Sequence, residues 1–557
     1  MSLPADTAVA VRPPTPARDL FFLSLLFAVV YFLPTGLRPL TNPDEGRYVE
    51  IAREMAVNHD FVSPHLNGVL YFEKPPLFYW LETSAVALGG TNLWVLRFWP
   101  IALAFLGAAA VYGTGRALWG RAAGWWSALA LSTCLLYYGV SQVIILDTAV
   151  SVFLTWAMCA FMLAVRAPPG RTRRNWCCAL YASMALALMT KGLIGLLIPS
   201  AIIFLWLLLL NKWRELRHAY IVLGILILLV LGLPWHIAAA LATPPPGGWD
   251  WAHFFSRDWH NQGFLWYYFV QQQFLRYLDH SVANRVQPWW FFFVLLPAGF
   301  FPWVLFLPSA IGSAIKGGWA RIKSEPETLF LFLWALFPLL FFSASSSKLP
   351  PYILPSVPPL ALLTGRYLAN LIAQPTAHTS VRSKMWAIVI VTALILAAVN
   401  PVAAHFLAVK KPSTASAAEW LRPRLQPGDQ VFTLLDFGPY QDFPPLLGRT
   451  IGIAGQIPDE QEFGLMLEPD KNAARYPGLA DYLALRRNAD KSPPTNEQIQ
   501  SALLTPFVAL LRSSAHIYAL ASADHFAIFR KMYPDAPAHI VWQGANLVLI
   551  SNQMAAK

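Results

Sequence analysis

Long apolar runs recur along this chain and constrain its fold more than any other feature. A hydrocarbon core of roughly 30 Å needs about 20 apolar residues in a helix that crosses it. Only 13% of the residues are charged, whereas a soluble protein has about 25%. We therefore predict a polytopic α-helical membrane protein with about 11 to 13 transmembrane helices. The expected spans lie near residues 20–38, 93–115, 122–141, 144–165, 175–189, 192–211, 219–242, 289–312, 327–343, 352–372 and 385–408. The shorter segment 77–90 is predicted to be a re-entrant or interfacial helix.

Basic residues in the connections predict the orientation, because short cytoplasmic loops retain Lys and Arg. With the N-terminus inside, every second connection is basic: Arg116 and Arg121; Arg166, Arg171, Arg173 and Arg174; Lys212, Arg214 and Arg217; Lys316, Arg321 and Lys323; Arg382 and Lys384. The outer side then holds the loops 39–92 and 243–287, Lys191, Lys348 and everything after about residue 409. The net charge of +11 is explained by this pattern, and we expect no nucleic acid partner.

From about residue 410 the composition becomes that of a soluble domain. We expect a transmembrane domain over residues 1–409 and a small α/β domain over 410–557, with a helix at Leu479–Arg487. Short buried strands are predicted at Gln430–Leu435, Phe507–Leu511, Phe526–Phe529 and Leu547–Ile550. The sequence has no P-loop, zinc-ligand spacing or internal repeat in this part or elsewhere, so we expect the chemistry in the membrane part.

Charged residues concentrate between Thr41 and Trp80, directly after the first span. Charged groups near a membrane cost several kcal/mol and are functional candidates for that reason. Asp44 opens a predicted amphipathic helix over Pro43–Met55 with an acidic first turn. We expect Asp44 to take part in chemistry, and Glu50 and Arg53 to face water on the outer side of that helix.

Further candidates fall on the same outer side. Glu73 and Lys74 stand between aromatic residues and a proline pair, and Lys348 lies between two spans where lysine is disfavoured. Asp147 begins a span, where an acid either caps the helix or belongs to a site. Carboxylates beside Lys74, Arg276 and Lys348 suit a polar lipid or sugar phosphate, because cations stabilise phosphate oxygens. No nucleotide sugar is available outside the cytoplasm, so a transferase there needs a donor carried by a lipid.

Several motifs together resemble one family. The segment Pro43–Met55 reads P-D-E-G-R-Y-V-E-I-A-R-E-M and is similar to the family pattern P-D-E-x-R-Y-x-E-I-x-R-E-M. Further correspondences are Pro64–Leu66, Tyr71–Pro75, Leu146–Thr148, Arg285–Trp289 and Lys348–Pro355. Up to about residue 410 the chain resembles the bacterial aminoarabinose transferases of lipid A, which are membrane glycosyltransferases of the GT-C type related to protein O-mannosyltransferases.

The resemblance implies an inverting transfer of 4-amino-4-deoxy-L-arabinose from undecaprenyl phosphate to lipid A phosphate groups. This reaction lowers the negative charge of the outer surface and confers resistance to polymyxin. It implies catalytic roles for Asp44, Glu73 and Asp147, and substrate binding by Arg47, Tyr48, Tyr71, Lys74, Arg276, Lys348 and Tyr352. A lipid A phosphate is already an anion at pH 7. We therefore expect Asp44 to orient the acceptor or to stabilise positive charge developing on the sugar.

By the same resemblance the protein lies in the bacterial inner membrane, surrounded by membrane lipids, with the active site and the C-terminal domain in the periplasm. We expect a monomer. One departure from the family affects the metal and the donor. Where the family commonly has E-H-x-x-R-F, this chain has Gln272-Gln273-Phe274-Leu275-Arg276-Tyr277. Neutral amides thus replace an acid and a metal ligand, and no cofactor is firmly expected. If a divalent metal ion takes part, Glu73 and His253 are its candidate ligands.

Two alternatives stay open. One is transfer of another sugar from a polyprenyl phosphate to a lipid, a glycan or a protein. The other, from a different class, is a transporter of lipids or solutes. Transporters usually hold ionisable residues near the bilayer midplane and often contain repeats. Here the ionisable residues gather at one surface and no repeat is present, which favours the enzyme.

Overall fold

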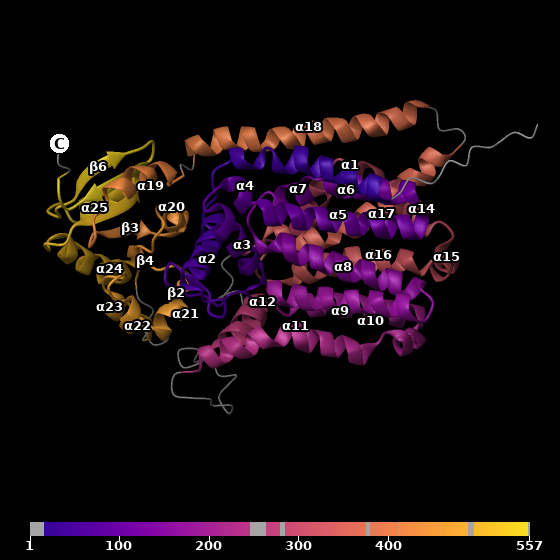
Figure 1. The fold of residues 1–557 in the computed structure, drawn as a ribbon, viewed down its shortest axis with the longest axis horizontal. Helices are drawn as coiled ribbons and strands as arrows, with labels where there is room; N and C mark the ends of the chain where they lie inside the picture. Colours follow the sequence, from indigo (N-terminus) through magenta and orange to yellow (C-terminus); the bar gives the residue numbers. More distant parts are fainter. Residues whose placement is uncertain are drawn as a thin grey trace, which may run out of the picture.

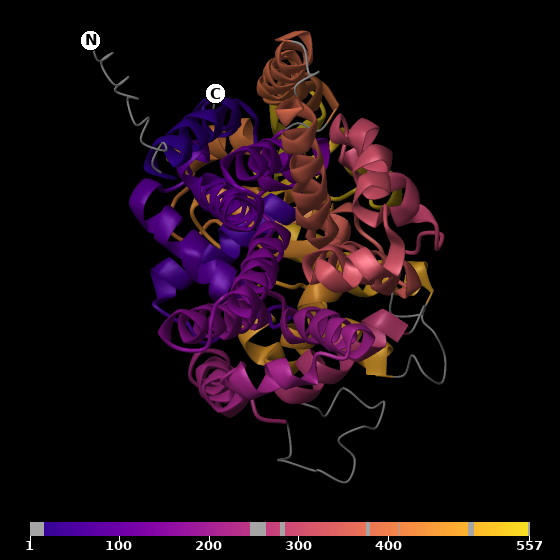
Figure 2. The same cartoon turned by 90° about the vertical axis from the view of Figure 1, so that its right-hand side faces the viewer.

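The computed structural model describes residues 16–245, 263–278, 285–374, 379–410, 413–487 and 495–554. A bundle of helices occupies one half of the molecule and an α/β domain the other, as Figure 1 shows. The predicted fold class is therefore confirmed. Seen from the end of the bundle in Figure 2, the helices lie in front of the C-terminal domain.

The bundle is formed by the first two thirds of the chain. Its elements are α1 (Pro16–Leu26), η1 (Phe27–Phe32), η2 (Thr35–Leu37), α2 (Asp44–Asn58), β1 (His65–Leu66), β2 (Val69–Leu70), α3 (Leu77–Gly89), α4 (Leu93–Leu96), α5 (Phe98–Trp119), α6 (Arg121–Ser132), α7 (Leu135–Ser141), α8 (Leu146–Arg166), α9 (Arg171–Lys191), α10 (Ile194–Leu210), η3 (Trp213–His218), α11 (Ile221–Ala242), η5 (Trp266–Leu275), α12 (Arg276–Leu278), α13 (Phe291–Gly299), η6 (Trp303–Phe306), α14 (Leu307–Ile315), α15 (Gly318–Ser324), α16 (Pro326–Ala344), η7 (Pro350–Ser356), α17 (Val357–Ala373) and α18 (Thr379–Lys410).

Every apolar segment predicted to span the membrane is helical, but fewer helices are long and apolar enough to cross it than we expected. Among the described residues there are 6 such helices, or 7 if the pair Phe291–Gly299 and Trp303–Ile315, bent by 98°, forms one span. The segment 122–141 is broken at Thr133, and α10 has only 17 residues. Segment 77–90 forms α3, which has 13 residues and packs against α2.

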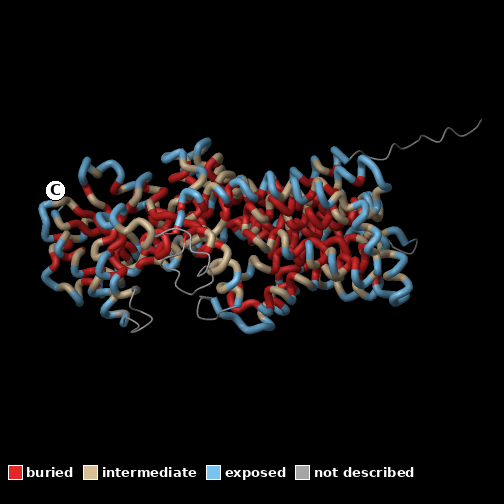
Figure 3. Tube along the Cα trace, turned by 90° about the horizontal axis from the view of Figure 1, so that it is seen from below, coloured by how far each residue is buried: buried red, intermediate tan, exposed pale blue. Residues whose placement is uncertain are grey.

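The outer surface of the bundle is apolar, as a hydrocarbon environment requires. Val222 and Leu241 of α11 and Leu394 of α18 are exposed. Large exposed apolar surfaces are rare on soluble proteins. Figure 3 shows that buried residues fill the interior of both halves. With its apolar helices, the chain is a multi-pass membrane protein.

The C-terminal domain is a five-stranded sheet with flanking helices. Its elements are α19 (Ala415–Leu421), η8 (Arg422–Arg424), β3 (Gln430–Asp436), η9 (Gly438–Tyr440), α20 (Phe443–Leu447), β4 (Gly452–Gln456), α21 (Asp459–Leu467), α22 (Pro469–Asn472), α23 (Leu479–Arg487), α24 (Asn496–Leu511), β5 (Ile517–Ser522), α25 (Ala523–Met532), β6 (His539–Gln543) and β7 (Leu547–Ser551). The strand order is β4-β3-β5-β7-β6. Strand β3 runs parallel to β4 and β5, whereas β7 is antiparallel to β5 and β6.

Two of the predicted strands in this domain are wrong. Residues 507–511 end helix α24 and residues 526–529 lie inside α25. A run of four or five apolar residues does not distinguish a buried strand from the buried face of a helix. The strands at Gln430–Leu435 and Leu547–Ile550 and the helix at Leu479–Arg487 are confirmed as parts of β3, β7 and α23.

The C-terminal domain packs directly on the first loop of the bundle, and α2 lies at the junction of the two halves (Figure 1). Asn42 Nδ2 donates to Asp442 Oδ1 at 2.7 Å, and Asn42 Oδ1 accepts from the Asp442 backbone N–H at 2.9 Å. A Cβ atom on Gly46 would lie 2.4 Å from the Asp442 backbone nitrogen. Glycine at position 46 thus permits α2 and the domain to touch through their backbones.

Candidate active site

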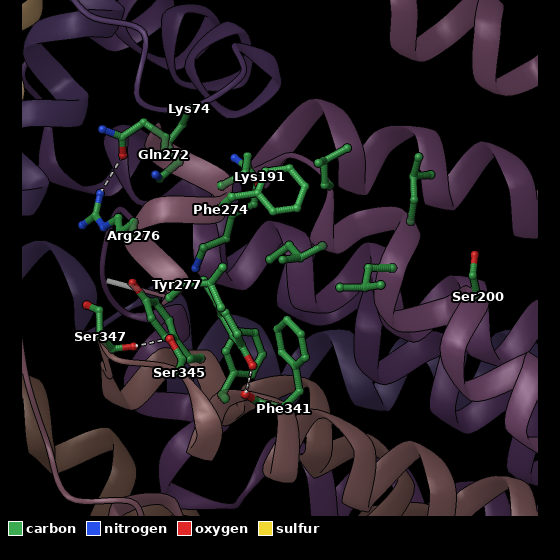
Figure 4. Close-up of a pocket in the computed structure, with 18 residues that line it drawn as sticks. Lys74, Lys191, Ser200, Gln272, Phe274, Arg276, Tyr277, Phe341, Ser345 and Ser347 are labelled. Atoms are coloured by element: carbon green, nitrogen blue, oxygen red, sulfur yellow. Dashed lines mark hydrogen bonds between the residues drawn. The ribbon is translucent and has the colours of Figure 1, made fainter. Parts of the chain in front are cut away.

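A cavity of about 630 Å³ opens near the junction and has one polar and one apolar end. In Figure 4, Lys74, Gln272 and Arg276 gather at one end, and Ser200 lies at the other. The apolar wall consists of Leu193, Ile194, Leu196, Leu197, Phe274, Leu278, Phe341 and Phe342. A lipid phosphate has the same division, with a charged head on an apolar chain.

Glu73 lies at the polar end among three donors. Arg276 Nη1 is 3.4 Å from Glu73 Oε2, the Tyr71 hydroxyl donates to the same oxygen at 3.3 Å, and Lys74 Nζ lies 3.9 Å away. Burial by itself would raise the pKa of Glu73. The positive charges of Arg276, Lys74 and Arg47 outweigh burial and lower this pKa to about 2. Glu73 is therefore an anion held in place by cations.

The neighbouring cations stabilise the charged form of Glu73 but destabilise the charged form of Lys74. Burial, followed by the charges of Arg276 and Lys191, lowers its pKa from the ordinary 10.5 to about 7, although Glu73 and Asp147 act in the other direction. An anion that enters the cavity beside Lys74 would stabilise its protonated form. This lysine is thus suited to bind a phosphate and to take up a proton as it does so.

Asp147 forms an ion pair with Lys191, the last residue of α9. The Lys191 ammonium also lies 4.2 Å from the centre of the Tyr352 ring, in a cation–π contact. The N-cap residue of α8 is Ile145, and no side chain caps this end of the helix, so Asp147 pairs with Lys191 and is not a cap. Our sequence reasoning assigned no role to Lys191. Its predicted place on the outer side, where lysine is disfavoured, was the available signal.

Asp44, Arg47, Tyr48 and Tyr71 form a second group beside this cavity. The Asp44 side chain is 40% exposed, and its Oδ1 lies 3.9 Å from Arg47 Nη1. Tyr48 and Tyr71 are buried against Tyr79, with ring centroids 5.8 and 6.4 Å away. Burial, then the neighbouring Tyr79, Asp44 and Asp147, raise the pKa of Tyr48. Both carboxylates therefore lie within electrostatic reach of one tyrosine.

Lys348 is beside the cavity but turned away from it. Its Nζ donates to the Ser345 backbone carbonyl at 2.5 Å, and the side chain is buried. Ser345 and Ser347, its neighbours in the turn, do line the cavity. Lys348 thus stabilises this turn. We expected its ammonium group to bind the substrate, but in this structure it binds the backbone.

Two acids of α2 differ from what the sequence suggested. Glu50 was expected to face water, but it is buried and accepts two hydrogen bonds of 2.7 Å from Arg53. Helix α2 is covered by α3, by β1 and by α20 of the C-terminal domain, which leaves it less open to water than its sequence suggested. Glu45, to which we assigned no role, is fully buried and pairs with Arg97 at 2.8 Å and Arg38 at 3.1 Å. Both acids support the helix and lie outside the cavity lining.

The residues proposed for a metal ion do not form a site in the part of the chain that the structure describes. There, no three His, Cys, Asp or Glu side chains lie close enough together to hold a cation. Glu73 is surrounded by cations, which would repel a divalent ion. His253 lies outside the described residues. We derive no step that involves a metal.

The proteins whose sequences are similar to this chain are glycosyltransferases by name. Residues 17–245 match the family model of dolichyl-phosphate-mannose-protein mannosyltransferases. The undecaprenyl phosphate-alpha-4-amino-4-deoxy-L-arabinose arabinosyl transferase of Erwinia tasmaniensis is 35% identical over 351 residues, which are 63% of this chain and 59% of that protein. The enzyme of the same name from Enterobacter sp. is 33% identical over 354 residues, 63% of this chain and 60% of that protein. The matches thus span about three fifths of these curated relatives' length.

Solved structures share the fold over nearly the whole chain. ArnT from Cupriavidus metallidurans, bound to undecaprenyl phosphate, superposes with a TM-score of 0.75 at 22% identity, over 97% of this chain and 99% of that one. The archaeal oligosaccharyltransferase AglB from Archaeoglobus fulgidus gives a TM-score of 0.54 at 14% identity, over 91% of this chain and 69% of that one.

The fold is therefore that of the membrane glycosyltransferases of the GT-C type, including a C-terminal domain on the same side as the candidate site. Within that class, the chain is similar to the undecaprenyl phosphate-aminoarabinose transferases, as its motifs indicated.

Proposed function

We propose that this protein transfers 4-amino-4-deoxy-L-arabinose from undecaprenyl phosphate to a phosphate group of lipid A, at the periplasmic face of the bacterial inner membrane. The observation that carries the proposal is the cavity with three cations, Lys74, Lys191 and Arg276, at one end of an apolar wall. The names of the similar enzymes and the undecaprenyl phosphate bound to the structural neighbour support the same donor. We infer a monomer that acts on its own.

The donor has a charged phosphate and an apolar prenyl chain, and each fits one end of the cavity. Its phosphate lies among Lys74, Lys191 and Arg276, where charge-assisted hydrogen bonds are stronger than neutral ones. Its prenyl chain lies along Leu193–Leu197 and Phe341, where it exchanges contact with lipid for contact with apolar side chains. The sugar then points toward Asp44 and Asp147, the carboxylates on the two sides of the site.

In the transfer step an oxygen of the lipid A phosphate forms a bond to the anomeric carbon of the sugar. The bond between that carbon and the undecaprenyl phosphate oxygen breaks, and the electron pair leaves with the phosphate. Lys74, Lys191 and Arg276 stabilise the negative charge that grows on this leaving group. Asp44 and Asp147 stabilise the positive charge that develops on the sugar. No general base is required because the acceptor oxygen carries no proton.

A second candidate is transfer of another sugar from the same carrier to a lipid, a glycan or a protein. The neutral amide of Gln272 favours it, because this residue lines the cavity and accepts from Arg276 Nη1 at 3.0 Å. We expect an amide here to favour a different sugar from the one that the carboxylate of the family pattern would favour. The ionisable groups of the candidate site lie at the end of the bundle next to the C-terminal domain, whereas transporters usually hold such groups near the bilayer midplane, which favours either transferase over a transporter.

Mass spectrometry of lipid A from cells with and without the protein tests the proposal. We expect a mass gain of one pentosamine that depends on the protein. A gain that matches a different sugar would favour the second candidate. Unchanged lipid A, with the enzyme inserted and the aminoarabinose donor present, would contradict the proposed function.

A further inference from the structure

Helix α21 of the C-terminal domain lies against the first outer loop, beside strand β2 (Figure 1). The rings of Phe463 and Tyr267 stack with centroids 3.9 Å apart and an interplanar angle of 5°. Gly464 comes so close to β2 that a Cβ atom there would lie 2.2 Å from the Leu70 carbonyl oxygen. Contact between backbones leaves little freedom, so α21 has a fixed position relative to the candidate site.

This helix presents Glu460 to Arg47. Glu460 Oε1 lies 2.8 Å from Arg47 Nη2. Gln441, also from the C-terminal domain, accepts from Arg47 Nε at 3.1 Å and donates to Glu460 Oε1 at 3.1 Å. The side chains of Arg47 and Glu460 are 12% and 16% exposed, so solvent screens this pair weakly.

The guanidinium of Arg47 is planar and offers its donors in fixed directions. With Nε and Nη2 engaged by Gln441 and Glu460, the remaining nitrogen, Nη1, lies 3.9 Å from Asp44 Oδ1. Arg47 is also one of the cations that act on Glu73. The direction of this one side chain therefore affects two acids of the site.

We propose that Glu460 is a positioning residue for the transfer reaction: it holds Arg47 between the two domains, so that the C-terminal domain completes the active site. The inference rests on the proposed function. Without the negative charge of Glu460, Arg47 would pair with the carboxylates that remain near it, Asp44 and Glu73. These acids would then be less available to the sugar and to the donor-binding cations.

The test uses purified full-length enzyme carrying Glu460→Gln, Arg47→Ala, or these two substitutions together. We expect Glu460→Gln, which keeps the size of the side chain, to lower kcat for sugar transfer about 10-fold while KM for the donor changes less than about 2-fold. If Glu460 acts through Arg47, the double variant is no slower than Arg47→Ala alone, because the two losses are not additive.

Glu462 supplies the matched control on the same helix. It pairs with Arg486 inside the domain at 2.8 Å and has no contact with Arg47 in the described structure. Glu462→Gln should lower the Tm of the enzyme and leave kcat unchanged. Wild-type kcat in Glu460→Gln, or additive losses in the double variant, would overturn the inference. The inference is tested by comparing each variant with the wild-type enzyme. The proposed function fails only if the wild-type enzyme itself does not transfer the sugar, so the two failures are distinguishable.

Discussion

Arg276 Nη1 lies 3.4 Å from Glu73 Oε2, although 203 residues separate the two in the chain. The contact joins α12, in the long connection between α11 and α13, to the charged segment between α2 and α3. It holds a guanidinium at the polar end of the cavity before any phosphate binds. If the donor phosphate binds as proposed, it would compete with Glu73 for that guanidinium.

We predict that Arg276→Ala weakens binding of the donor, because a charge-assisted hydrogen bond to its phosphate is lost. Such a bond contributes about 1.5–3 kcal/mol, so KM for the donor should rise roughly 10- to 100-fold. Steady-state kinetics on purified enzyme measure it. Arg321→Ala, at the remote end of the bundle, is the control. An unchanged KM for the donor in Arg276→Ala would contradict the assignment.

The pH dependence of donor binding tests Lys74. Its pKa of about 7 in the free protein means that the ammonium form is lost as pH rises through 7. The phosphodiester group of the donor does not titrate in that range, and the amine of its sugar is the same in both enzymes compared below. We therefore expect kcat/KM for the donor to fall above about pH 7, and Lys74→Arg, which keeps its charge, to remove that fall. A Lys74→Arg enzyme with the wild-type profile would exclude Lys74 as the titrating group.

Asp44→Asn should abolish transfer while the protein stays folded and inserted. The amide keeps the shape of the side chain and removes the charge that stabilises the sugar in the transition state. Loss of one such electrostatic group commonly lowers kcat about 100- to 1,000-fold. Transfer is followed by mass spectrometry of lipid A, and folding by the Tm in detergent. Full transfer by Asp44→Asn would be incompatible with its proposed role.

Its neighbour Glu45 has the opposite role and should give the opposite result. Removing one member of a buried ion pair commonly costs about 3–5 kcal/mol, and Glu45→Ala leaves both Arg38 and Arg97 without their carboxylate. We expect a large fall in the Tm of Glu45→Ala. A comparison with Asp44→Asn separates stability from catalysis within one helical turn. A Glu45→Ala protein as stable as the wild type would show that the buried triad is dispensable.

Much of the candidate site could be predicted because charge is expensive near a membrane. The concentration of charge between Thr41 and Trp80 pointed to Glu73 and Lys74; Lys74 lines the polar end of the cavity, and Glu73 pairs with it from behind the lining. The helix predicted over Pro43–Met55 is confirmed as α2. Lys191 could have been identified by the same orientation rule that drew attention to Lys348.

Other features depend on contacts that no local pattern contains. Glu50 has the spacing of a water-facing residue, but elements from other parts of the chain, including α3, the β1–β2 hairpin and α20, pack on α2, and Glu50 is buried. Lys348 has the expected location, but its side chain turns toward the backbone of Ser345. The contact between Arg47 and Gln441 could not be predicted from the sequence, because the two residues are 394 positions apart and a single sequence does not indicate which distant residues pair.

The junction between α2 and the C-terminal domain has a consequence for how the protein is made. Asn67 in the first loop bonds to Ile451, 384 residues later, and to Arg475, 408 residues later. A ribosome therefore completes every helix of the bundle before it makes the residues that cover this loop. A chain that stops after α18 would carry the cations of the cavity but neither Gln441 nor Glu460. We expect such a fragment to capture the carrier lipid and to leave the sugar on it.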